Sequence, residues 1–74
     1  MDIEKRVFLL AIYKKKDDES LKDVIAQMED AKVFNFKEGK KLLKEFKNEK
    51  LIVNSTLSFS GIQQAQEIEQ EFKI

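Results

Sequence analysis

The sequence predicts a mainly α-helical fold with one small β-hairpin. Three stretches repeat their apolar residues at the spacing of one helix face, and the third leads directly into a short segment of β-favouring residues. A polar two-residue corner and a second short segment then complete a tight hairpin, after which helical spacing returns. We therefore expect three helices, a hairpin with a minimal loop and a C-terminal helix, all in a single domain over residues 1–74.

The first helix is expected from Ile3 to about Lys15. Its apolar residues fall into two sets, one that shares a face and one that widens the apolar arc: Ile3, Val7, Leu10 and Ala11, then Phe8, Ile12 and Tyr13. An arc this wide predicts a helix buried at the centre of the core. The alternative is that its second apolar side meets another subunit.

The second helix is expected to begin after Ser20, a favourable N-cap residue with Asp23 at the third helical position. Its apolar residues follow the helical template without interruption: Leu21, Val24, Ile25 and Met28. The helix should end between Asp30 and Lys32. The acidic residues 17–19 lie just before its N-terminus, where the helix dipole favours negative charge. We interpret them as structural and not as a metal or catalytic site.

The third helix is expected from Phe36 to about Glu49, after a turn over residues 31–34. Asn35 and Glu38 form a capping pattern at its start. At ~100° per residue, four residues point towards the core: Gly39, Leu42, Leu43 and Phe46. The opposite face carries Lys37, Lys40, Lys41, Lys44, Lys47 and Asn48, and one edge carries Glu38, Glu45 and Glu49. This helix is therefore predicted to be apolar inward and cationic outward.

The hairpin is expected over residues 51–57, with Asn54 and Ser55 at the corner between its two strands. Either Ser58 or Ser60 can cap the last helix. One face of that helix is predicted to be apolar: Ile62, Ala65, Ile68 and Phe72.

The residue types that are absent exclude several classes of function. The sequence contains no cysteine and no histidine, which removes disulfides, thiolate nucleophiles, the commonest metal ligands and the usual general base at neutral pH. It also has no loop of calcium-binding spacing. We therefore predict no enzymatic activity, no metal site and no cofactor, and we infer no small-molecule ligand. The longest apolar run, residues 7–13, is too short to cross a bilayer, which favours a cytoplasmic protein with no membrane partner.

Charge is balanced overall but not along the chain. The 14 basic residues match the 14 acidic ones, which argues against a generic binder of polyanions. Residues 17–31 carry six acidic residues and one lysine, whereas residues 32–50 carry seven lysines and three glutamates. Positive charge is thus concentrated on and around the third helix.

In its element order the chain resembles the winged helix-turn-helix domains of MarR-like and PadR-like bacterial regulators. The matching pieces are residues 42–52 (LLKEFKNEKLI), which resemble a recognition helix that runs into a wing strand, and residues 57–61 (LSFSG), which resemble the helix start after the wing. The resemblance implies a DNA-binding regulator, expected as a homodimer. Two features depart from those families: the wing is minimal with no lysine or arginine from residue 51 to residue 72, and the turn before the third helix is longer.

The residues that we expect to contact double-stranded DNA are Lys37, Lys40, Lys41, Lys44, Lys47 and Asn48. Lysines can neutralise backbone phosphates but cannot read guanine as an arginine fork does. Asn48 and the capping Asn35 are the amide side chains of this region that could read adenine. Such binding should be sensitive to salt and weakly sequence-specific, with Lys14, Lys15 and Lys16 as additional backbone contacts.

Three other interpretations of the same residues remain open. The lysines could serve solubility alone, supported by neighbouring pairs Glu38–Lys41, Glu45–Lys41 and Glu45–Lys44. They could also contact an acidic protein. The alternative function is a winged-helix module for protein interaction that does not bind DNA and uses the last helix, through Ile62, Ile68, Phe72 and Ile74.

Overall fold

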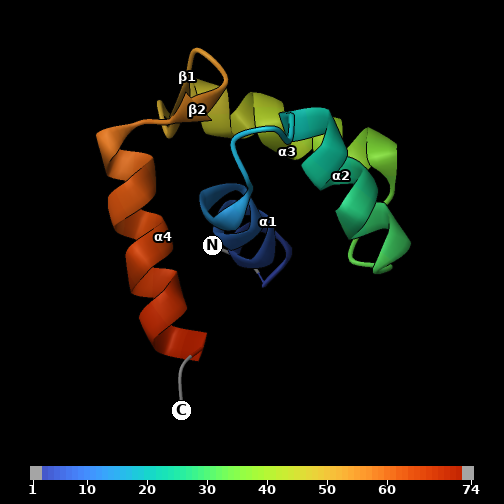
Figure 1. Ribbon diagram of the computed structural model, residues 1–74, viewed down its shortest axis with the longest axis horizontal. Helices are drawn as coiled ribbons and strands as arrows, with labels where there is room; N and C mark the ends of the chain where they lie inside the picture. Colours follow the sequence, from blue (N-terminus) through green and yellow to red (C-terminus); the bar gives the residue numbers. More distant parts are fainter. Residues whose placement is uncertain (1–2, 73–74) are drawn as a thin grey trace.

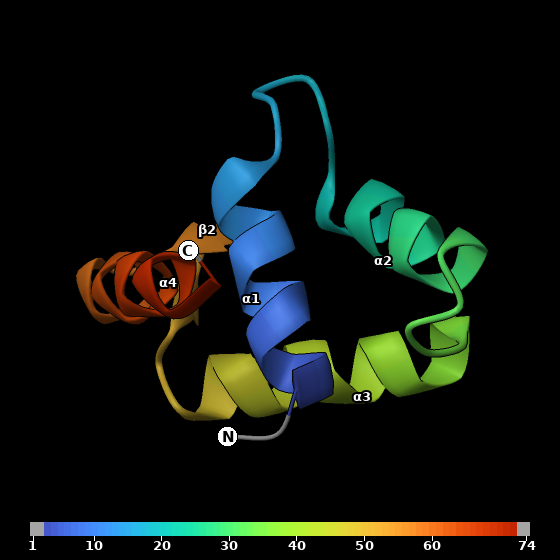
Figure 2. The same ribbon diagram turned by 90° about the horizontal axis from the view of Figure 1, so that it is seen from below.

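The computed structural model describes residues 3–72 and is mainly helical, with one small antiparallel hairpin, as predicted. Its elements, in chain order, are α1 (Ile3–Lys14), α2 (Leu21–Asp30), α3 (Phe36–Asn48), β1 (Ile52–Val53), β2 (Thr56–Leu57) and α4 (Phe59–Phe72). α1 lies at the centre and packs against α4 on one side and α2 on the other, as Figure 1 shows. α3 packs against α2 and crosses the end of the molecule before it leads into the hairpin (Figure 2).

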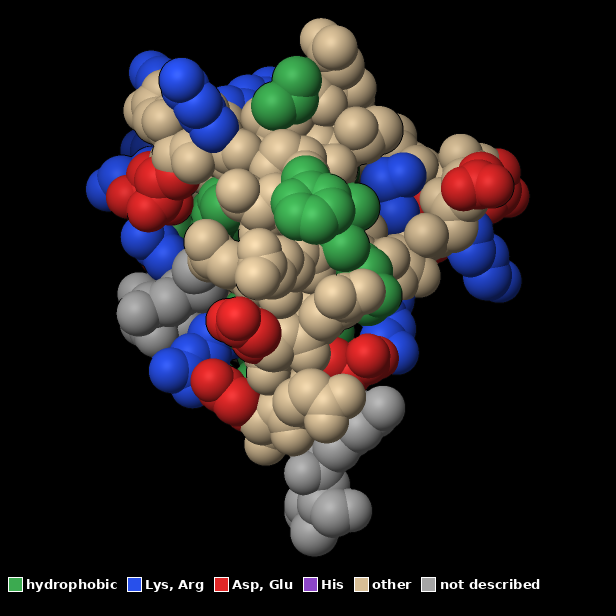
Figure 3. Space-filling view, turned by 90° about the vertical axis from the view of Figure 1, so that its left-hand side faces the viewer, with side chains coloured by type: hydrophobic (Ala, Val, Ile, Leu, Met, Phe, Trp, Pro, Cys, Tyr) green, Lys and Arg blue, Asp and Glu red, His purple; other side chains and the backbone are tan. Residues whose placement is uncertain are grey.

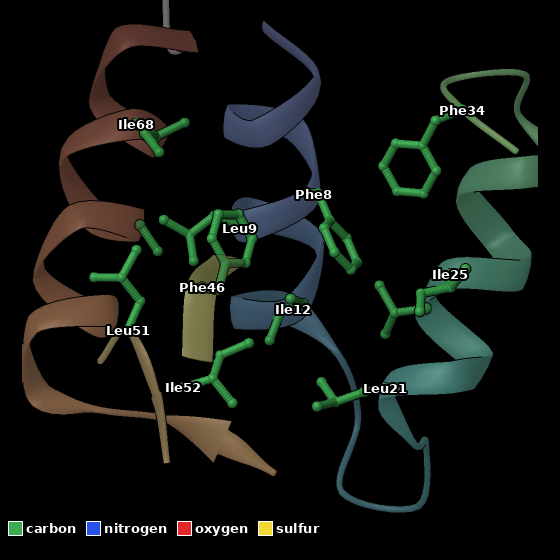
Figure 4. Packing of buried hydrophobic residues seen from close by; sticks show 12 residues of the cluster. Phe8, Leu9, Ile12, Leu21, Ile25, Phe34, Phe46, Leu51, Ile52 and Ile68 are labelled. Carbon is green, nitrogen blue, oxygen red and sulfur yellow. The ribbon is translucent and has the colours of Figure 1, made fainter. Parts of the chain in front are cut away.

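The core is one cluster of buried residues drawn from all four helices, β1 and the segments beside them. Phe8 lies at its centre, because its ring contacts Phe34 edge-on at 5.1 Å and stacks on Phe46 at 5.6 Å between ring centroids. In Figure 4, Phe8 points towards Phe34 on the α2 side of α1, whereas Leu9 points towards α4. Burial of α1 on two sides is therefore confirmed.

The predicted apolar face of α1 is wrong in detail. Its buried residues are Phe8, Leu9 and Ile12, whereas Ile3 is 59% exposed. The reason is that α1 lies between two helices, so its buried arc is centred between Phe8 and Leu9 and not on the set that begins with Ile3. No second subunit is needed to cover that arc.

The predicted start of α2 is confirmed. The Ser20 hydroxyl accepts a hydrogen bond from the Asp23 N–H, and the Asp23 carboxylate accepts one from the Ser20 N–H. At the start of α3, the Asn35 side chain accepts from the Glu38 N–H at 2.8 Å. These caps satisfy backbone donors that have no partner inside the helix.

Both α2 and α3 end in the same way, with a lysine in the left-handed region. Lys32 and Lys50 each have φ of 61° and donate to the carbonyl three residues back, while the next residue donates to the carbonyl five residues back. This is the Schellman pattern, in which glycine is the usual left-handed residue. The turn between α2 and α3 is then held by the buried side chain of Phe34.

The hairpin has the predicted two-residue corner. Val53 pairs with Thr56 and Ile52 with Leu57. Asn54 and Ser55 have φ of 53° and 66°, the left-handed conformation that a tight hairpin turn of this type requires at both positions.

Of the two candidate caps for α4, the structure uses Ser58. Its hydroxyl accepts from the Gly61 N–H at 3.1 Å and donates to the Lys50 carbonyl at 2.6 Å. Gly61 sits against the backbone here, because an added Cβ would overlap the carbonyl oxygen of Leu51. Glycine thus allows α4 to start close to the hairpin.

The predicted apolar face of α4 is only partly buried. Ala65 and Ile68 are in the core together with Gly61, but Ile62 is 37% and Phe72 is 42% exposed. Gly61 and Ala65 let α4 pack closely beside the hairpin and α1, and this turns Ile62 and Phe72 towards the edge of the contact. Polar pairs also join α4 to α1: Arg6 Nη1 lies 3.0 Å from Glu71 Oε2, Lys14 pairs with Glu69, and Gln66 donates to the Tyr13 hydroxyl at 3.2 Å.

Candidate nucleic-acid interface

The cationic face of α3 points outward because its opposite face packs closely on α2. Phe46 is buried, and Gly39 permits the close approach: an added Cβ would lie 2.6 Å from Ile25 Cγ2 and 2.7 Å from Phe34 Cε1. Leu42 and Leu43 are half-buried on either side of this contact. α3 is therefore fixed in rotation by large side chains on one side only.

All six residues predicted to contact DNA are exposed, and the helix brings them together on the side away from the core: Lys37, Lys40, Lys41, Lys44, Lys47 and Asn48. We call this set the α3 lysine face. Within residues 3–72, none of its five lysines takes part in a salt bridge. The positive charge of this face is thus not neutralised by carboxylates of the described part of the chain.

The predicted support from glutamates on the same helix is not observed. The Glu45 carboxylate lies 3.8 Å from the Lys5 ammonium on α1 and pairs with it instead of with Lys41 or Lys44. The cause is position: Glu45 lies on the edge of α3 that faces the start of α1. Glu45 therefore pairs with α1, although it lines a hollow together with Glu38 and Lys41.

The structure separates the three consecutive lysines at the end of α1, residues 14–16. Lys14 pairs with Glu69 of α4, and this hydrogen-bonded carboxylate raises the pKa of the Lys14 ammonium above its ordinary value. Lys15 instead lines a surface groove beside α3. Lys16 is exposed, and its backbone N–H donates to the Glu19 carboxylate at 2.8 Å.

The groove beside α3 has a volume of about 470 Å³ and is formed by four separate segments. Its polar lining residues are Lys15, Glu19, Ser20, Lys22, Lys47 and Ser55. Lys22 and Ser55 were not predicted as site residues. Lys22 is the single lysine of an acidic segment and Ser55 belongs to an uncharged hairpin, so neither gives a signal in the sequence.

A second surface is apolar and lies at the start of α4. Phe59 is 85% exposed, and Val53 on the hairpin and Ile62 on α4 are also exposed. Figure 3 shows hydrophobic side chains gathered over this part of the molecule. Of the residues predicted for a protein-binding last helix, Ile68 is buried, and Ile74 lies outside the described residues.

Other kinds of site receive no support from residues 3–72. No group of acidic side chains in this range is arranged to hold a metal ion. No helix in the same range combines the length and apolar character needed to cross a membrane.

Comparison of the chain with protein-family models, with curated proteins and with solved structures finds no match.

Proposed function

We propose that this chain is a small winged-helix DNA-binding protein that regulates transcription and contacts double-stranded DNA through α3. The observation that carries the proposal is the α3 lysine face: five exposed lysines and Asn48 on one side of a rigidly packed helix, with no salt bridge to those lysines within residues 3–72. An exposed helix with unneutralised cations suits the major groove, which admits a helix between two phosphate backbones.

The residue types indicate what such a helix could recognise. Lysine ammonium groups are flexible point charges, so they favour phosphates over base edges. Asn48 lies in the last turn of α3 and is the one member of the face able to read an adenine edge bidentately. We therefore expect strong dependence on salt and weak discrimination among sequences.

The fold supports α3 as the main contact. The order of three helices, hairpin and fourth helix is the order of a winged helix-turn-helix. The two-residue hairpin corner is short and uncharged, so it offers no cation to an adjacent groove. A homodimer would place two copies of α3 in major grooves about 34 Å apart. We place this activity in the cytoplasm.

The test is a titration of the purified protein with random-sequence duplex DNA at two salt concentrations. We expect Lys41→Glu combined with Lys44→Glu to abolish binding and to leave the unfolding curve nearly unchanged, because both side chains are exposed. The matched control is Lys32→Glu combined with Lys50→Glu, which changes the net charge equally at exposed positions outside α3. Equal losses in both double variants, or no loss in either, would contradict a role for the lysine face.

A second candidate function is protein interaction through the apolar surface of Val53, Phe59 and Ile62. A phenylalanine that is 85% exposed at a helix start favours it, because large exposed apolar side chains that cluster commonly mark contact sites. Phe59→Ser should lower any self-association measured by sedimentation, whereas Ile3→Ser, at another exposed apolar position, should not. An unchanged sedimentation coefficient for Phe59→Ser would exclude this surface from self-association. Ile68→Asp is unsuitable as a test because Ile68 is in the core and a charge there would unfold the protein.

A further inference from the structure

We propose that the groove beside α3 binds the phosphodiester backbone of the same duplex that the α3 lysine face contacts. This inference rests on the proposed function and extends it to residues from three further segments. The groove is built from the connector after α1, the first turn of α2, the last turn of α3 and the tip of the hairpin. The connector and the start of α2 adjoin each other but lie far in the sequence from the end of α3 and the hairpin, so only the folded chain brings these two parts together.

Three lysine side chains line the groove, from Lys15, Lys22 and Lys47. Ser20 and Ser55 add hydroxyl groups at its rim, and a hydroxyl can donate a hydrogen bond to a phosphate oxygen. Two leucine side chains, Leu21 and Leu43, complete the lining. The lysine and serine side chains of this lining are of the types that bind phosphate groups, and the leucines with the lysine stems form its apolar floor.

One acidic side chain, Glu19, lines the groove. Two hydrogen bonds to its carboxylate reduce its repulsion of an anion. Glu19 accepts from the Lys16 N–H at 2.8 Å and from the Gln27 side-chain amide. Both donors direct their hydrogen atoms at the carboxylate and disperse its charge. Among the side chains that line the groove, three are lysines and one is a glutamate, while the Asp23 carboxylate beside them is held by the Ser20 N–H.

Lys47 makes the groove continuous with the α3 lysine face, because it belongs to both. A duplex that lay along α3 would bring one strand past Lys47 and then past Lys22 and Lys15. The short hairpin contributes to this path through the Ser55 hydroxyl and backbone, and not through a cation. The inferred site thus supplies the phosphate contacts at the side of α3 that the uncharged hairpin does not.

The test compares two double variants of the full chain, each of which removes two positive charges. Lys15→Gln with Lys22→Gln removes two of the three lysine charges of the groove. Lys32→Gln with Lys50→Gln is the matched control, since both lysines are exposed and lie outside the groove and outside the α3 lysine face. Binding of a random-sequence duplex is measured over a series of salt concentrations, and urea unfolding verifies that both variants are folded.

For the groove variant we expect the slope of log K against log salt to become shallower by about 1 for each lysine removed. Between about 50 and 200 mM salt, the wild-type protein should then lose roughly tenfold more affinity than the groove variant does. The control should keep a slope close to that of the wild-type protein.

Two results would overturn the inference, and they differ in what they say of the proposed function. The first result is the same slope of log K against log salt in the groove variant and the control, together with loss of binding in Lys41→Glu with Lys44→Glu. In that case the groove does not bind phosphates, and the proposed function stands. If the wild-type protein binds no duplex even at low salt, both the proposed function and the inference fail.

Discussion

Basic side chains have different roles on the two sides of this molecule. Where α1 meets α4, Arg6 and Lys14 pair with Glu71 and Glu69 and help to hold the two helices together. On the outer side of α3, five lysines of the same chemical type have no salt bridge within the described range. Net charge alone therefore says little about the role of a basic side chain in this protein. What matters is whether the fold places a carboxylate within reach of each cation.

Two glycines allow close packing, Gly61 where α4 meets the segment before the hairpin and Gly39 where α3 meets α2. Substitution of Gly61 gives the prediction with the largest effect. In Gly61→Ala the new methyl group would overlap the Leu51 carbonyl oxygen, which is backbone and cannot move aside without shifting the hairpin. We expect a loss of about 3 kcal/mol in the free energy of unfolding, measured with urea. Gly39→Ala meets the buried side chains of Ile25 and Phe34, which can repack by a small shift more readily than a backbone carbonyl can move. Part of its strain is offset by the better helix propensity of alanine, so a loss of about 1 kcal/mol is expected. Equal losses in the two variants would show that backbone and side-chain obstacles are equivalent here.

A smaller effect of opposite sign is expected at the end of α3. Lys50 has φ of 61°, a left-handed conformation that is strained for a residue with a side chain. Lys50→Gly should raise the free energy of unfolding by up to about 1 kcal/mol, because the relief of strain exceeds the extra entropy of glycine in the unfolded chain. The same substitution at exposed Lys47, inside the helix, should lower it by about 1 kcal/mol. A loss of stability in Lys50→Gly would mean that its side chain contributes more than its backbone conformation costs.

The smallest effect concerns the ion pair between Lys14 and Glu69. The pKa of the Lys14 ammonium is raised above its ordinary value of 10.5 chiefly by the hydrogen bond to Glu69. Since the folded state holds this proton more tightly than the unfolded state, the pair stabilises the protein below that ordinary value. Its contribution is lost as pH rises through the higher pKa of the folded state. Urea unfolding from pH 9 upward should show this decline in the wild-type protein and a weaker decline in Glu69→Gln. Identical pH profiles would assign the pair no role in stability.

The central part of the chain was the most predictable from sequence. α2 and α3 each combine a capping residue with an uninterrupted apolar stripe, so Ser20 and Asn35 located their starts and the stripe located their buried faces. The hairpin corner followed from two residues, Asn54 and Ser55, that tolerate positive φ. In these elements local chemistry and tertiary packing favour the same structure.

The outer helices were less predictable because their buried faces depend on neighbours that come from elsewhere in the chain. α1 is apolar on so many sides that periodicity could not identify Leu9 as a core residue. α4 uses Gly61 and Ala65 at its contact, and small residues give a weak hydrophobic signal. The α3 lysine face could be predicted from the spacing within a single helix. The groove beside it could not, because Lys15, Lys22, Lys47 and Ser55 meet only through tertiary structure.

The contact between α1 and α4 joins the two ends of the described chain, and this has a consequence for the order of folding. Arg6 and Glu71 are 65 positions apart, whereas α2 and α3 are neighbours joined by a short turn. Closing a loop of that length has a large entropic cost that must be met before its contacts stabilise anything. We therefore expect α4 to dock last and to open first, with faster amide hydrogen exchange in α4 than in α3. Uniform exchange across both helices would contradict this order. If α4 does open first, the lysine face can persist on a partly open protein, because α3 packs mainly against α2.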